Sequence, residues 1–411
     1  MSDPNAPSPG HVPNSVRDSS GTSRADEAAR SITRMFGHRL CFLPGTHLAA
    51  VQRPSGRVPN PAHPWHYWWQ AHYLDCLVDT ARRELRQNRP FDGDGRLSAG
   101  RLASRLVTGI RLRNFLTFVN SYYDDMAWLA LATQRLQMLA EETGTPGGRR
   151  NVRMLTALKL QFDSASTLHL GGGTFWNTTR DFKNTPATAP VALFYARNGN
   201  TTKAQELLDW LEARLFDPAK GLYLDGIRMR RDGGEELVDA VYTYNQGPVL
   251  GALLELGGVQ NLKRAAGLID AVDRALTLLA QVGNGKDLGT GKDRVLRGEG
   301  TGDGGLFTGI LARYLALAAA DPRLPAAIRA TASRLVTETA EALWKGRRLI
   351  TAGEALARHG GVMVFSINPD IPASATYPPG AVVELSTQLQ AWMILEAAAT
   401  LADAEISTQI N

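Results

Sequence analysis

Two adjacent carboxylates, Asp124 and Asp125, stand at the start of a long apolar segment and are the residues best placed to do chemistry. The apolar run from Met126 to Ala132 continues through later leucines at helical spacing, so it predicts a helix whose first turn contains both aspartates. Aspartate is a preferred residue at this position, because it accepts backbone N–H groups and complements the helix dipole. A helix cap is therefore the simpler interpretation, and catalysis is the alternative.

Catalysis by such a pair would be that of a glycosidase that retains anomeric configuration. These enzymes need two carboxyl groups about 5 Å apart, one acting as nucleophile and one as acid/base. At the first turn of a helix, where the chain enters from a loop, both side chains can point into one cleft. The helix N-terminus would keep one carboxylate ionised, and its charge would raise the pKa of the other. Tyr122, Tyr123 and Trp128 would supply rings for the C–H faces of a sugar.

Further segments combine aromatic rings with side-chain amides at predicted helix ends. They are Trp65–Gln70, Phe175–Asn177 and Tyr242–Gln246. A ligand rich in hydroxyl groups needs this mixture of flat apolar faces and hydrogen-bonding edges. For each segment alone, core aromatics and helix caps explain the pattern equally well. The candidate substrate contacts from these segments and their neighbours are Trp68, Gln70, His72, Tyr123, Trp176, Asn177, Tyr244, Asn245 and Gln246.

Other motifs that could carry chemistry are weaker. His63, His66 and His72 lie close together, but they lack the metalloprotease spacing and no cysteine stands at ligand spacing, so we expect no metal. The segment Gly285–Lys292 lacks the second glycine and the hydroxyl residue of a phosphate-binding loop, and no cofactor is expected. Asp303, in a glycine-rich segment, is expected to cap the next helix, with sugar contact as the lesser alternative.

Composition excludes several classes of function. The chain has 411 residues, of which 44% are hydrophobic, enough for a large core. Its net charge of +5 is not gathered into a basic stripe with aromatic residues, so nucleic-acid binding is not favoured. Cys41 and Cys76 are too few for a disulfide framework, and we expect both to be reduced, buried thiols. No apolar run reaches transmembrane length and residues 1–23 do not resemble a signal peptide, so a cytoplasmic monomer is expected.

Helical periodicity dominates the chain from Arg24 onward. One predicted helix opens at the aspartate pair and stops before Gly144. The other predicted helices cover residues 26–36, 65–85, 98–112, 151–164, 186–198, 202–216, 242–256, 261–282, 303–320, 325–344 and 383–403, with short strands at 221–226 and 363–365. The strand–helix alternation of α/β folds is missing, and no strict repeat is visible. We therefore expect an all-α domain over residues 25–405, closed on itself so that the polar and aromatic loops gather at one mouth. A disordered tail is expected at 1–24 and a second tail at 406–411.

These motifs together resemble glycoside hydrolase family 76, the bacterial and fungal α-1,6-mannanases. The aspartate-pair motif is the specific one, and the other segments support it in the same order along the chain. The matching segments are Tyr122–Trp128, Gly172–Asn177 with Lys183 and Asn184, Tyr242–Gly247, and Phe307–Ile310 with Arg313 and Tyr314. Phe175 stands where the family commonly has a second tryptophan, which leaves substrate length and endo or exo action open.

The resemblance implies an (α/α)6 toroid with its site at one mouth, and retaining hydrolysis of α-1,6-linked mannose in mannan or mannooligosaccharides. By position, Asp124 would be the nucleophile and Asp125 the general acid/base. Trp176, Asn177, Tyr244 and Asn245 would line the sugar sites, and Lys183, Asn184 and Phe307 are added to the candidate substrate contacts.

Two other classes of function stay open from the residues alone. An epimerase or unsaturated-uronide hydrolase could use the same toroid, and an epimerase would need a histidine base. His63, His66, His72 and His359 are the candidates for that base, although none is convincingly paired. The second class is a non-catalytic carbohydrate-binding or scaffold protein, which would bind mannan without turning it over.

Overall fold

The computed structural model describes residues 21–55, 65–145, 147–281, 294–351, 353–356 and 361–410, the last six by their backbone only. Most of the predicted N-terminal tail, residues 1–20, as well as His63, His359 and the whole segment Gly285–Lys292, lie outside these ranges. Residues 21–24, predicted as tail, form the first turn of helix α1 (Gly21–Phe36). Most of the predicted C-terminal tail is also helical, since α13 (Leu385–Ile410) extends through residue 410.

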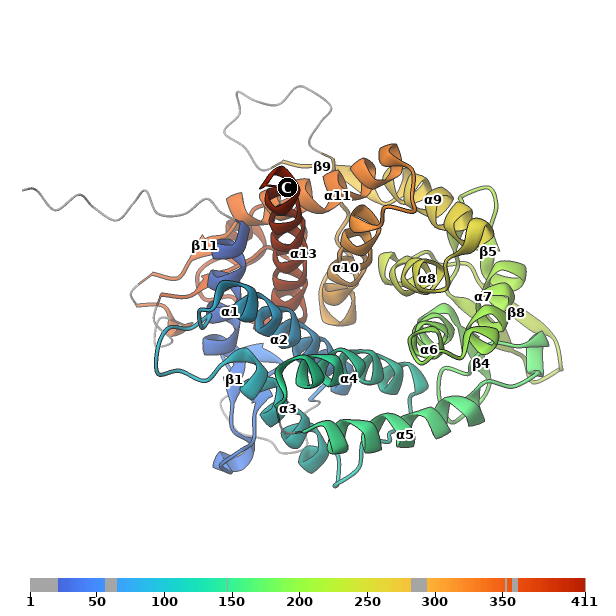
Figure 1. Cartoon of the computed structure of the whole chain (residues 1–411), viewed down its shortest axis with the longest axis horizontal. Helices are drawn as coiled ribbons and strands as arrows, with labels where there is room; N and C mark the ends of the chain where they lie inside the picture. Colours follow the sequence, from blue (N-terminus) through green and yellow to red (C-terminus); the bar gives the residue numbers. More distant parts are fainter. Residues whose placement is uncertain are drawn as a thin grey trace, which may run out of the picture.

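Twelve long helices within the described residues form two concentric rings (Figure 1). The inner ring consists of α2 (Tyr67–Gln87), α4 (Tyr123–Thr143), α6 (Thr185–Arg197), α8 (Thr243–Leu256), α10 (Phe307–Ala320) and α13. The outer ring consists of α1, α3 (Ala99–Arg113), α5 (Gly148–Ala165), α7 (Thr201–Leu215), α9 (Gly258–Ala275) and α11 (Ala326–Lys345). Each inner helix contacts the next and α13 returns to α2, so the ring is closed. The expected (α/α)6 toroid is confirmed.

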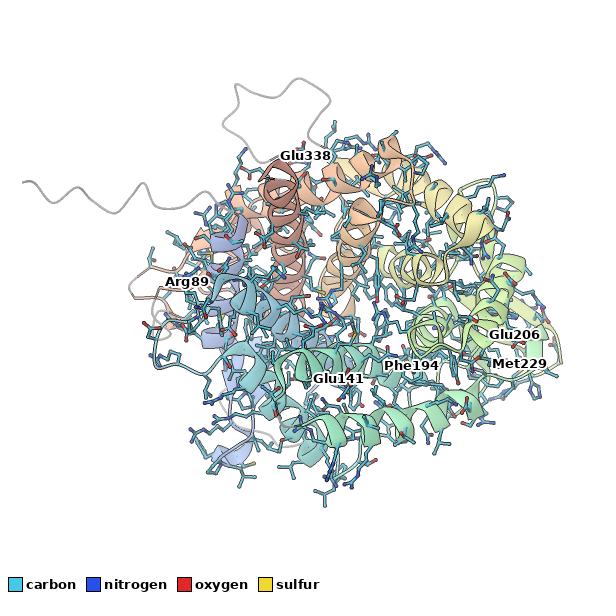
Figure 2. All side chains as sticks on the ribbon, in the orientation of Figure 1. Arg89, Glu141, Phe194, Glu206, Met229 and Glu338 are labelled. Atoms are coloured by element: carbon cyan, nitrogen blue, oxygen red, sulfur yellow. The ribbon has the colours of Figure 1, made fainter. Side chains whose placement is uncertain are left out.

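The sequence itself decides which helices lie inside. In the inner helix α6, every residue from Thr185 to Ala196 is buried, as expected of a helix that is apolar on all sides. The outer helix α5 buries one stripe instead, through residues at helical spacing: Asn151, Met154, Leu158, Phe162 and Ala165. Charged side chains such as Glu206 and Glu338 consequently lie at the periphery (Figure 2).

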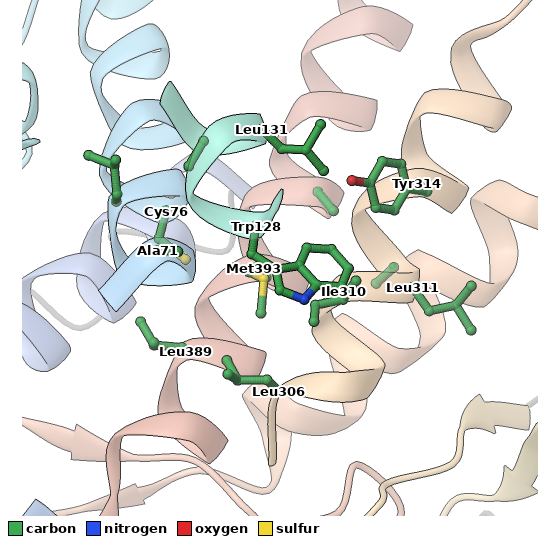
Figure 3. Close-up of a cluster of buried hydrophobic side chains, with 14 of the residues drawn as sticks. Ala71, Cys76, Trp128, Leu131, Leu306, Ile310, Leu311, Tyr314, Leu389 and Met393 are labelled. Atoms are coloured by element: carbon green, nitrogen blue, oxygen red, sulfur yellow. The ribbon is translucent and has the colours of Figure 1, made fainter. Parts of the chain in front are cut away.

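Side chains from several inner helices meet in one buried cluster at the ring (Figure 3). Trp128 of α4 lies there beside Met393 of α13 and Ile310 of α10, with Ala71 and Cys76 of α2 nearby. Cys76 is buried as expected, whereas the prediction for Cys41 is wrong, because that thiol is exposed and lies in the loop after α1. No helix among the described residues has the length and apolar character that a membrane span requires.

The remaining elements are short and connect the helices. The three-stranded antiparallel sheet has the order β4 (Phe182–Asn184), β7 (Gly226–Met229), β8 (Glu235–Val238). Two-stranded pairs are β1 (Gly37–His38) with β2 (Leu48–Ala49), β3 (Gln52–Arg53) with β13 (Val383–Glu384), β5 (Phe216–Asp217) with β6 (Leu222–Tyr223), β9 (Thr277–Leu279) with β10 (Arg294–Leu296), and β11 (Arg348–Leu349) with β12 (Met363–Val364). Short helical turns are η1 (Leu40–Phe42), η2 (His169–Gly171), η3 (Gly302–Leu306) and α12 (Ala373–Thr376).

The predicted helix over 261–282 ends early, at Ala275. Residues 277–279 form β9 instead, because their backbone pairs with β10. That partner lies 15 residues further along the chain, so a local hydrophobic pattern could not reveal it.

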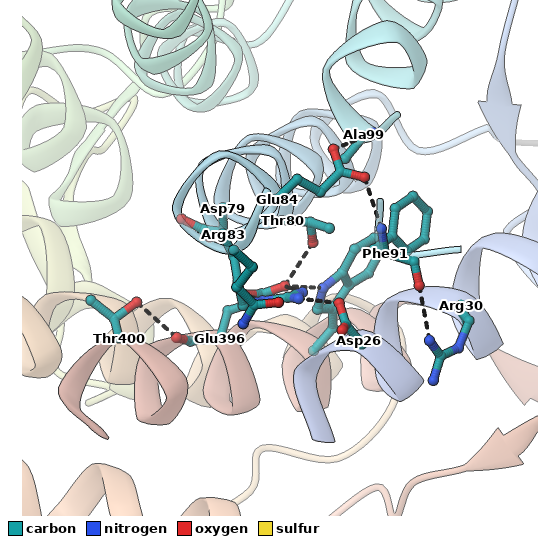
Figure 4. A network of polar contacts seen from close by, with 12 residues as sticks. Asp26, Arg30, Asp79, Thr80, Arg83, Glu84, Phe91, Ala99, Glu396 and Thr400 are labelled. Carbon is teal, nitrogen blue, oxygen red and sulfur yellow. Dashed lines mark hydrogen bonds and ion pairs between the residues drawn. The ribbon is translucent and has the colours of Figure 1, made fainter. Parts of the chain in front are cut away.

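A buried charge network joins the first helices of the chain, α1 and α2, to its last helix, α13 (Figure 4). Arg83 of α2 is fully buried and donates to Glu396 of α13 at 2.7 and 2.9 Å, and also to Asp26 of α1. Thr80 donates to the same glutamate at 2.6 Å. Since a buried ion network loses most when one partner is removed, we expect Arg83→Met to lower the free energy of unfolding by about 3–5 kcal/mol.

Urea denaturation followed by circular dichroism measures this loss. Arg82→Met is the matched control, because Arg82 pairs with Glu142 at 3.0 Å on the surface, where such pairs contribute about 0–1 kcal/mol. Equal losses in the two variants would contradict the assigned role of the network.

Candidate active site

The N-terminal ends of the inner helices meet at one end of the toroid. Trp68, in the first turn of α2, donates its indole N–H to Asp303 at 3.0 Å, just before α10. Phe307, the first residue of α10, stacks on Tyr244 of α8, with ring centroids 3.7 Å apart and planes at 9°. Tyr244 also lies 6.5 Å from the ring of Trp128 in α4. The aspartate pair lies in the first turn of α4, at this same end of the toroid. Residues from four inner helices, α2, α4, α8 and α10, therefore gather there.

Asp124 and Asp125 occupy the first turn of α4 and are both half-buried. Asp124 accepts two hydrogen bonds, from the indole N–H of Trp176 at 2.9 Å and from the backbone N–H of Asp125 at 2.9 Å. Asp125 accepts one, from the side-chain amide of Asn120 at 2.8 Å. The capping function expected for a first-turn aspartate accounts for only one of these contacts.

The loop between α5 and α6 fixes the geometry of the pair. It runs beside the chain that enters α4, where Tyr122 pairs with Asn177 in an isolated antiparallel bridge. The N–H of Tyr123 donates to the carbonyl of Trp176 at 2.8 Å, and the N–H of Thr178 donates to the carbonyl of Ser121 at 2.9 Å. These backbone bonds hold the Trp176 ring over Asp124 and in edge contact with Tyr122, at 5.2 Å.

Burial raises the pKa of both aspartates. For Asp124 the pKa lies well above its usual range because of burial and then the charge of Asp125, opposed by the two N–H donors. For Asp125 burial, with a smaller contribution from the charge of Asp303, raises the pKa to about 7, opposed by the Asn120 amide. The pair thus retains a proton near neutral pH. The larger upward shift in pKa falls on Asp124, but the two carboxyl groups titrate together, so the shifts do not decide which of them holds the proton. Because Asp124 accepts two N–H groups and Asp125 one, we assign the negative charge to Asp124 and the proton to Asp125.

The raised pKa of Asp125 makes stability depend on pH. Its folded value of about 7 exceeds the ordinary 3.8, so the folded state binds more protons between these two values and loses stability as pH rises through that window. We expect Asp125→Asn, which cannot titrate, to gain stability relative to wild type by at least about 1 kcal/mol between pH 4 and pH 8. Chemical denaturation at both pH values measures it. A difference that does not change with pH would show that Asp125 titrates normally.

Aromatic rings form a wall beside the pair. Trp68 lies 6.2 Å from Phe307 and 6.5 Å from Tyr244, and the ring of Tyr244 lies 6.5 Å from that of Trp128. Burial raises the pKa of Tyr244 well above its usual range, and the negative charges of Asp225, Asp124 and Asp303 raise it further. Of the predicted substrate contacts, the structure brings together Trp68, Trp176, Tyr244 and Phe307 around the aspartates.

Other predicted contacts have their polar groups occupied by the backbone. Gln70 is fully buried; its carbonyl accepts the Ala49 N–H at 2.9 Å and its amide donates to the Ala49 carbonyl at 3.0 Å. Gln246 binds both backbone groups of Tyr223 in the same way, at 2.9 Å each. Both glutamines therefore join the start of an inner helix to a short strand, β2 or β6, and the geometry assigns them a structural part rather than sugar contact.

Lys183 and Asn184 also hold the backbone. The buried Lys183 ammonium donates to the carbonyls of four loop residues at 2.6–3.0 Å: Thr167, His169, Gly172 and Gly173. Asn184 caps α6 by accepting the N–H of Ala187 at 3.1 Å. Tyr123 is buried, and the side chain of Asn177 accepts the N–H of Thr179 at 3.0 Å within its own loop. These residues shape the loop that carries Trp176.

His72 is buried beneath the aromatic wall, with its ring 5.0 Å from Trp128 and 5.4 Å from Trp68. Burial and then the charge of Arg313 lower its pKa far below the usual value, so the imidazole is neutral. Its Nε2 has no hydrogen-bond partner among the described residues. Within the same residues, no three His, Cys, Asp or Glu side chains come close enough to hold a metal ion.

Two further carboxylates belong to this region. The expectation that Asp303 caps a helix is wrong, because its carboxylate accepts the indole N–H groups of Trp68 and Trp69, at 3.0 and 2.8 Å. Asp225 was missed. It lies 3.5 Å from the amide of the buried Asn245, and burial raises its pKa to about 6. The only sequence signal for Asp225 is an acid at the end of the short apolar segment 221–224, which is a weak one.

Comparisons with known proteins agree on one family. The model of glycosyl hydrolase family 76 matches residues 47–354. The α-1,6-mannanase GH76A from Salegentibacter sp. HEL1_6 is 28% identical with a TM-score of 0.71, over 93% of this chain and 99% of that one. An inactive variant of that enzyme, with two consecutive aspartates changed to asparagine, was solved with α-1,6-mannotriose and matches with 28% identity, a TM-score of 0.70 and the same coverage.

The Lin0763 protein from Listeria innocua shares the fold, with 23% identity and a TM-score of 0.70 over 94% of this chain and 98% of that one. A search of curated proteins found no match.

Proposed function

Because this chain belongs to glycosyl hydrolase family 76 and is a glycoside hydrolase, we propose that it cleaves α-1,6-mannosidic linkages in mannan or mannooligosaccharides with retention of configuration. The observation that carries this proposal is the half-buried pair Asp124–Asp125, in which the two carboxyl groups have different hydrogen-bond donors. The Salegentibacter enzyme, an α-1,6-mannanase, was made inactive by changing two consecutive aspartates, which supports the assignment.

The proposed mechanism gives each aspartate one task per step. Asp124, kept ionised by the Trp176 and backbone N–H groups, attacks the anomeric carbon, while Asp125 donates its proton to the leaving glycosidic oxygen. Asp125 then takes a proton from water, which releases mannose from Asp124. The Asn120 amide orients Asp125 for both proton transfers.

The surroundings of the pair suit a sugar. Rings of Trp68, Tyr244 and Phe307 offer apolar faces for the C–H side of mannose, and the carboxylates of Asp225 and Asp303 offer acceptors for its hydroxyls. Asp303 already spans two indole N–H groups, so it is held in place before a sugar arrives.

Product analysis on linear α-1,6-mannotriose and mannotetraose tests the function, with wild type and Asp124→Asn side by side. We expect cleavage by wild type only, with the α-anomer formed first, and the product lengths separate endo from exo action. The β-anomer as first product would overturn the retaining mechanism. Binding without turnover by wild type would favour a carbohydrate-binding protein, and activity lost in His72→Ala but kept in both aspartate variants would favour an epimerase.

A further inference from the structure

A cavity lies at the opposite end of the toroid from the aspartate pair. Its volume is about 530 Å³, within the range of small-molecule sites. It is enclosed by the C-terminal halves of α2 and α4 and by the starts of α3 and α5. On α4, Leu139 in its wall is separated from Asp125 by 14 residues, which at 1.5 Å per residue is about 21 Å. The cavity is therefore separate from the catalytic region.

The floor of this cavity is apolar. Leu136 and Leu139 of α4, with Ala81 of α2, are almost fully buried and line it, and the side chain of Leu85 is half exposed at its edge. Gly100 of α3 leaves room above them, since a Cβ at this position would make only ordinary contacts, at 3.8 Å from Ala81 and 4.0 Å from Leu139. A ligand in this cavity needs an apolar body.

Arg150, on the α5 side, is a half-buried charge without a counter-charge. Its guanidinium donates only to neutral acceptors, namely the Ser104 carbonyl at 3.1 Å, the Thr108 hydroxyl at 3.2 Å, the Ser104 hydroxyl at 3.3 Å and the Asn151 amide oxygen at 3.5 Å. Its Nε is buried without a partner, and no carboxylate pairs with it within the described ranges. Burial lowers its pKa, as expected for a charge taken out of water and left unpaired.

The rest of the lining adds to the positive charge. Arg101 is exposed at its edge, whereas Arg89, at the outer edge of the molecule (Figure 2), already forms an ion pair with Asp26. Glu84 is the one acid among the described lining residues, and its two carboxylate oxygens accept the N–H groups of Phe91 at 2.9 Å and Ala99 at 3.0 Å (Figure 4). Both of its oxygens are therefore occupied in joining α2 to α3, and Arg101 and Arg150 outnumber this single acid, so the cavity favours an anion.

We propose that this cavity binds a small amphiphilic anion, with its charged group on Arg150 and its apolar body over Leu136 and Leu139. The site is independent of the aspartate pair and of the proposed hydrolysis. Both halves of the ligand are needed: the leucines give affinity in proportion to the apolar area buried, and the guanidinium gives a charge-assisted hydrogen bond.

The probe for this site is 1-anilinonaphthalene-8-sulfonate, whose fluorescence rises on transfer to an apolar site. The full chain is expected to bind it saturably at one site. Arg150→Gln is expected to weaken binding about tenfold, the size of one charge-assisted hydrogen bond. Gly100→Leu is expected to abolish it by filling the cavity, while hydrolysis of mannotriose stays unchanged. Arg149→Gln, which removes the same charge from an exposed neighbour, is the matched control and is expected to bind normally.

Competition defines the ligand class. Dodecanoate and dodecyl phosphate are expected to displace the probe, and dodecanol is not. Displacement by dodecanoate alone, or by dodecyl phosphate alone, would identify the charged group. Equal loss of affinity in Arg149→Gln and Arg150→Gln, or full binding by Gly100→Leu, would overturn the proposal. If Gly100→Leu does not fold, the comparison of Arg149→Gln with Arg150→Gln still tests the proposal.

Discussion

Asp124→Asn should lower kcat/KM on α-1,6-mannotriose by about 10⁴-fold or more, since removing a covalent nucleophile has an effect of this order. The two carboxylate oxygens of Asp124 each accept one N–H group, from Trp176 and from Asp125, and asparagine has the same size and keeps one of these two acceptors. A variant that keeps its fold therefore reports the loss of chemistry. Steady-state assays that follow release of the reducing-end product give kcat/KM, and circular dichroism confirms that the variant is folded.

Asp303→Asn is the matched comparison for Asp124→Asn. Asp303 is also a carboxylate in this region, but it is exposed and bound to two tryptophans, so it can position a substrate without reacting. We expect its loss to reduce kcat/KM about tenfold, the value of one or two hydrogen bonds. If the two variants lost equal activity, or if Asp124→Asn stayed within tenfold of wild type, Asp124 would not be the nucleophile.

The sequence predicts the helices well because outer helices such as α5 have a one-sided apolar pattern and inner helices such as α6 are apolar throughout. Closure of the ring could be expected but not predicted in detail, because it depends on contacts between distant parts of the chain that no local pattern contains. The network of Arg83 with Asp26 and Glu396 is an example, since its members lie up to 370 residues apart in the chain. The short strands show the same limit, as with the end of α9, where pairing of β9 with a distant segment determines the structure.

Only part of the candidate site could be predicted, because the use of a polar side chain also depends on contacts between distant segments. Residue type indicates that the side chain of a glutamine or lysine can bind a sugar. It does not indicate whether backbone groups already use the hydrogen bonds of that side chain. Gln70 and Gln246 stand at the fourth position of α2 and α8, and Gln388 stands at the fourth position of α13, binding the backbone of Phe365 at 2.9 Å. This contact between a glutamine in the first turn of an inner helix and the backbone of another segment recurs around the ring, although no sequence repeat is visible. Asp225 was missed because only the fold brings the segment 221–226 beside Asn245.

Asp125→Asn should show an effect that depends on the leaving group. On mannotriose, whose leaving oxygen is a poor one, loss of the general acid is expected to lower kcat/KM by about 10²–10⁴-fold. On 2,4-dinitrophenyl α-mannoside, whose leaving group needs no proton, kcat/KM is expected to stay within about tenfold of wild type. The second step still lacks its base, so kcat falls, and added azide, which needs no deprotonation, is expected to restore turnover by attacking the mannosyl-enzyme. The Asp124→Asn variant should not respond to azide in this way, because it forms no such intermediate.

The pH profile separates the same two roles. Because Asp125 must be protonated in the free enzyme and its pKa is raised to about 7, wild-type kcat/KM on mannotriose is expected to fall as pH rises above about 7. The fall at low pH reports protonation of the pair as a whole, since the two carboxyl groups titrate together. With the dinitrophenyl mannoside as substrate, the alkaline fall is expected to disappear, in wild type and in Asp125→Asn alike, because the first step no longer needs the acid. An alkaline fall of equal size on both substrates would mean that another group controls it, and the proton donor would then have to be sought among the neighbouring carboxyl groups, Asp225 first.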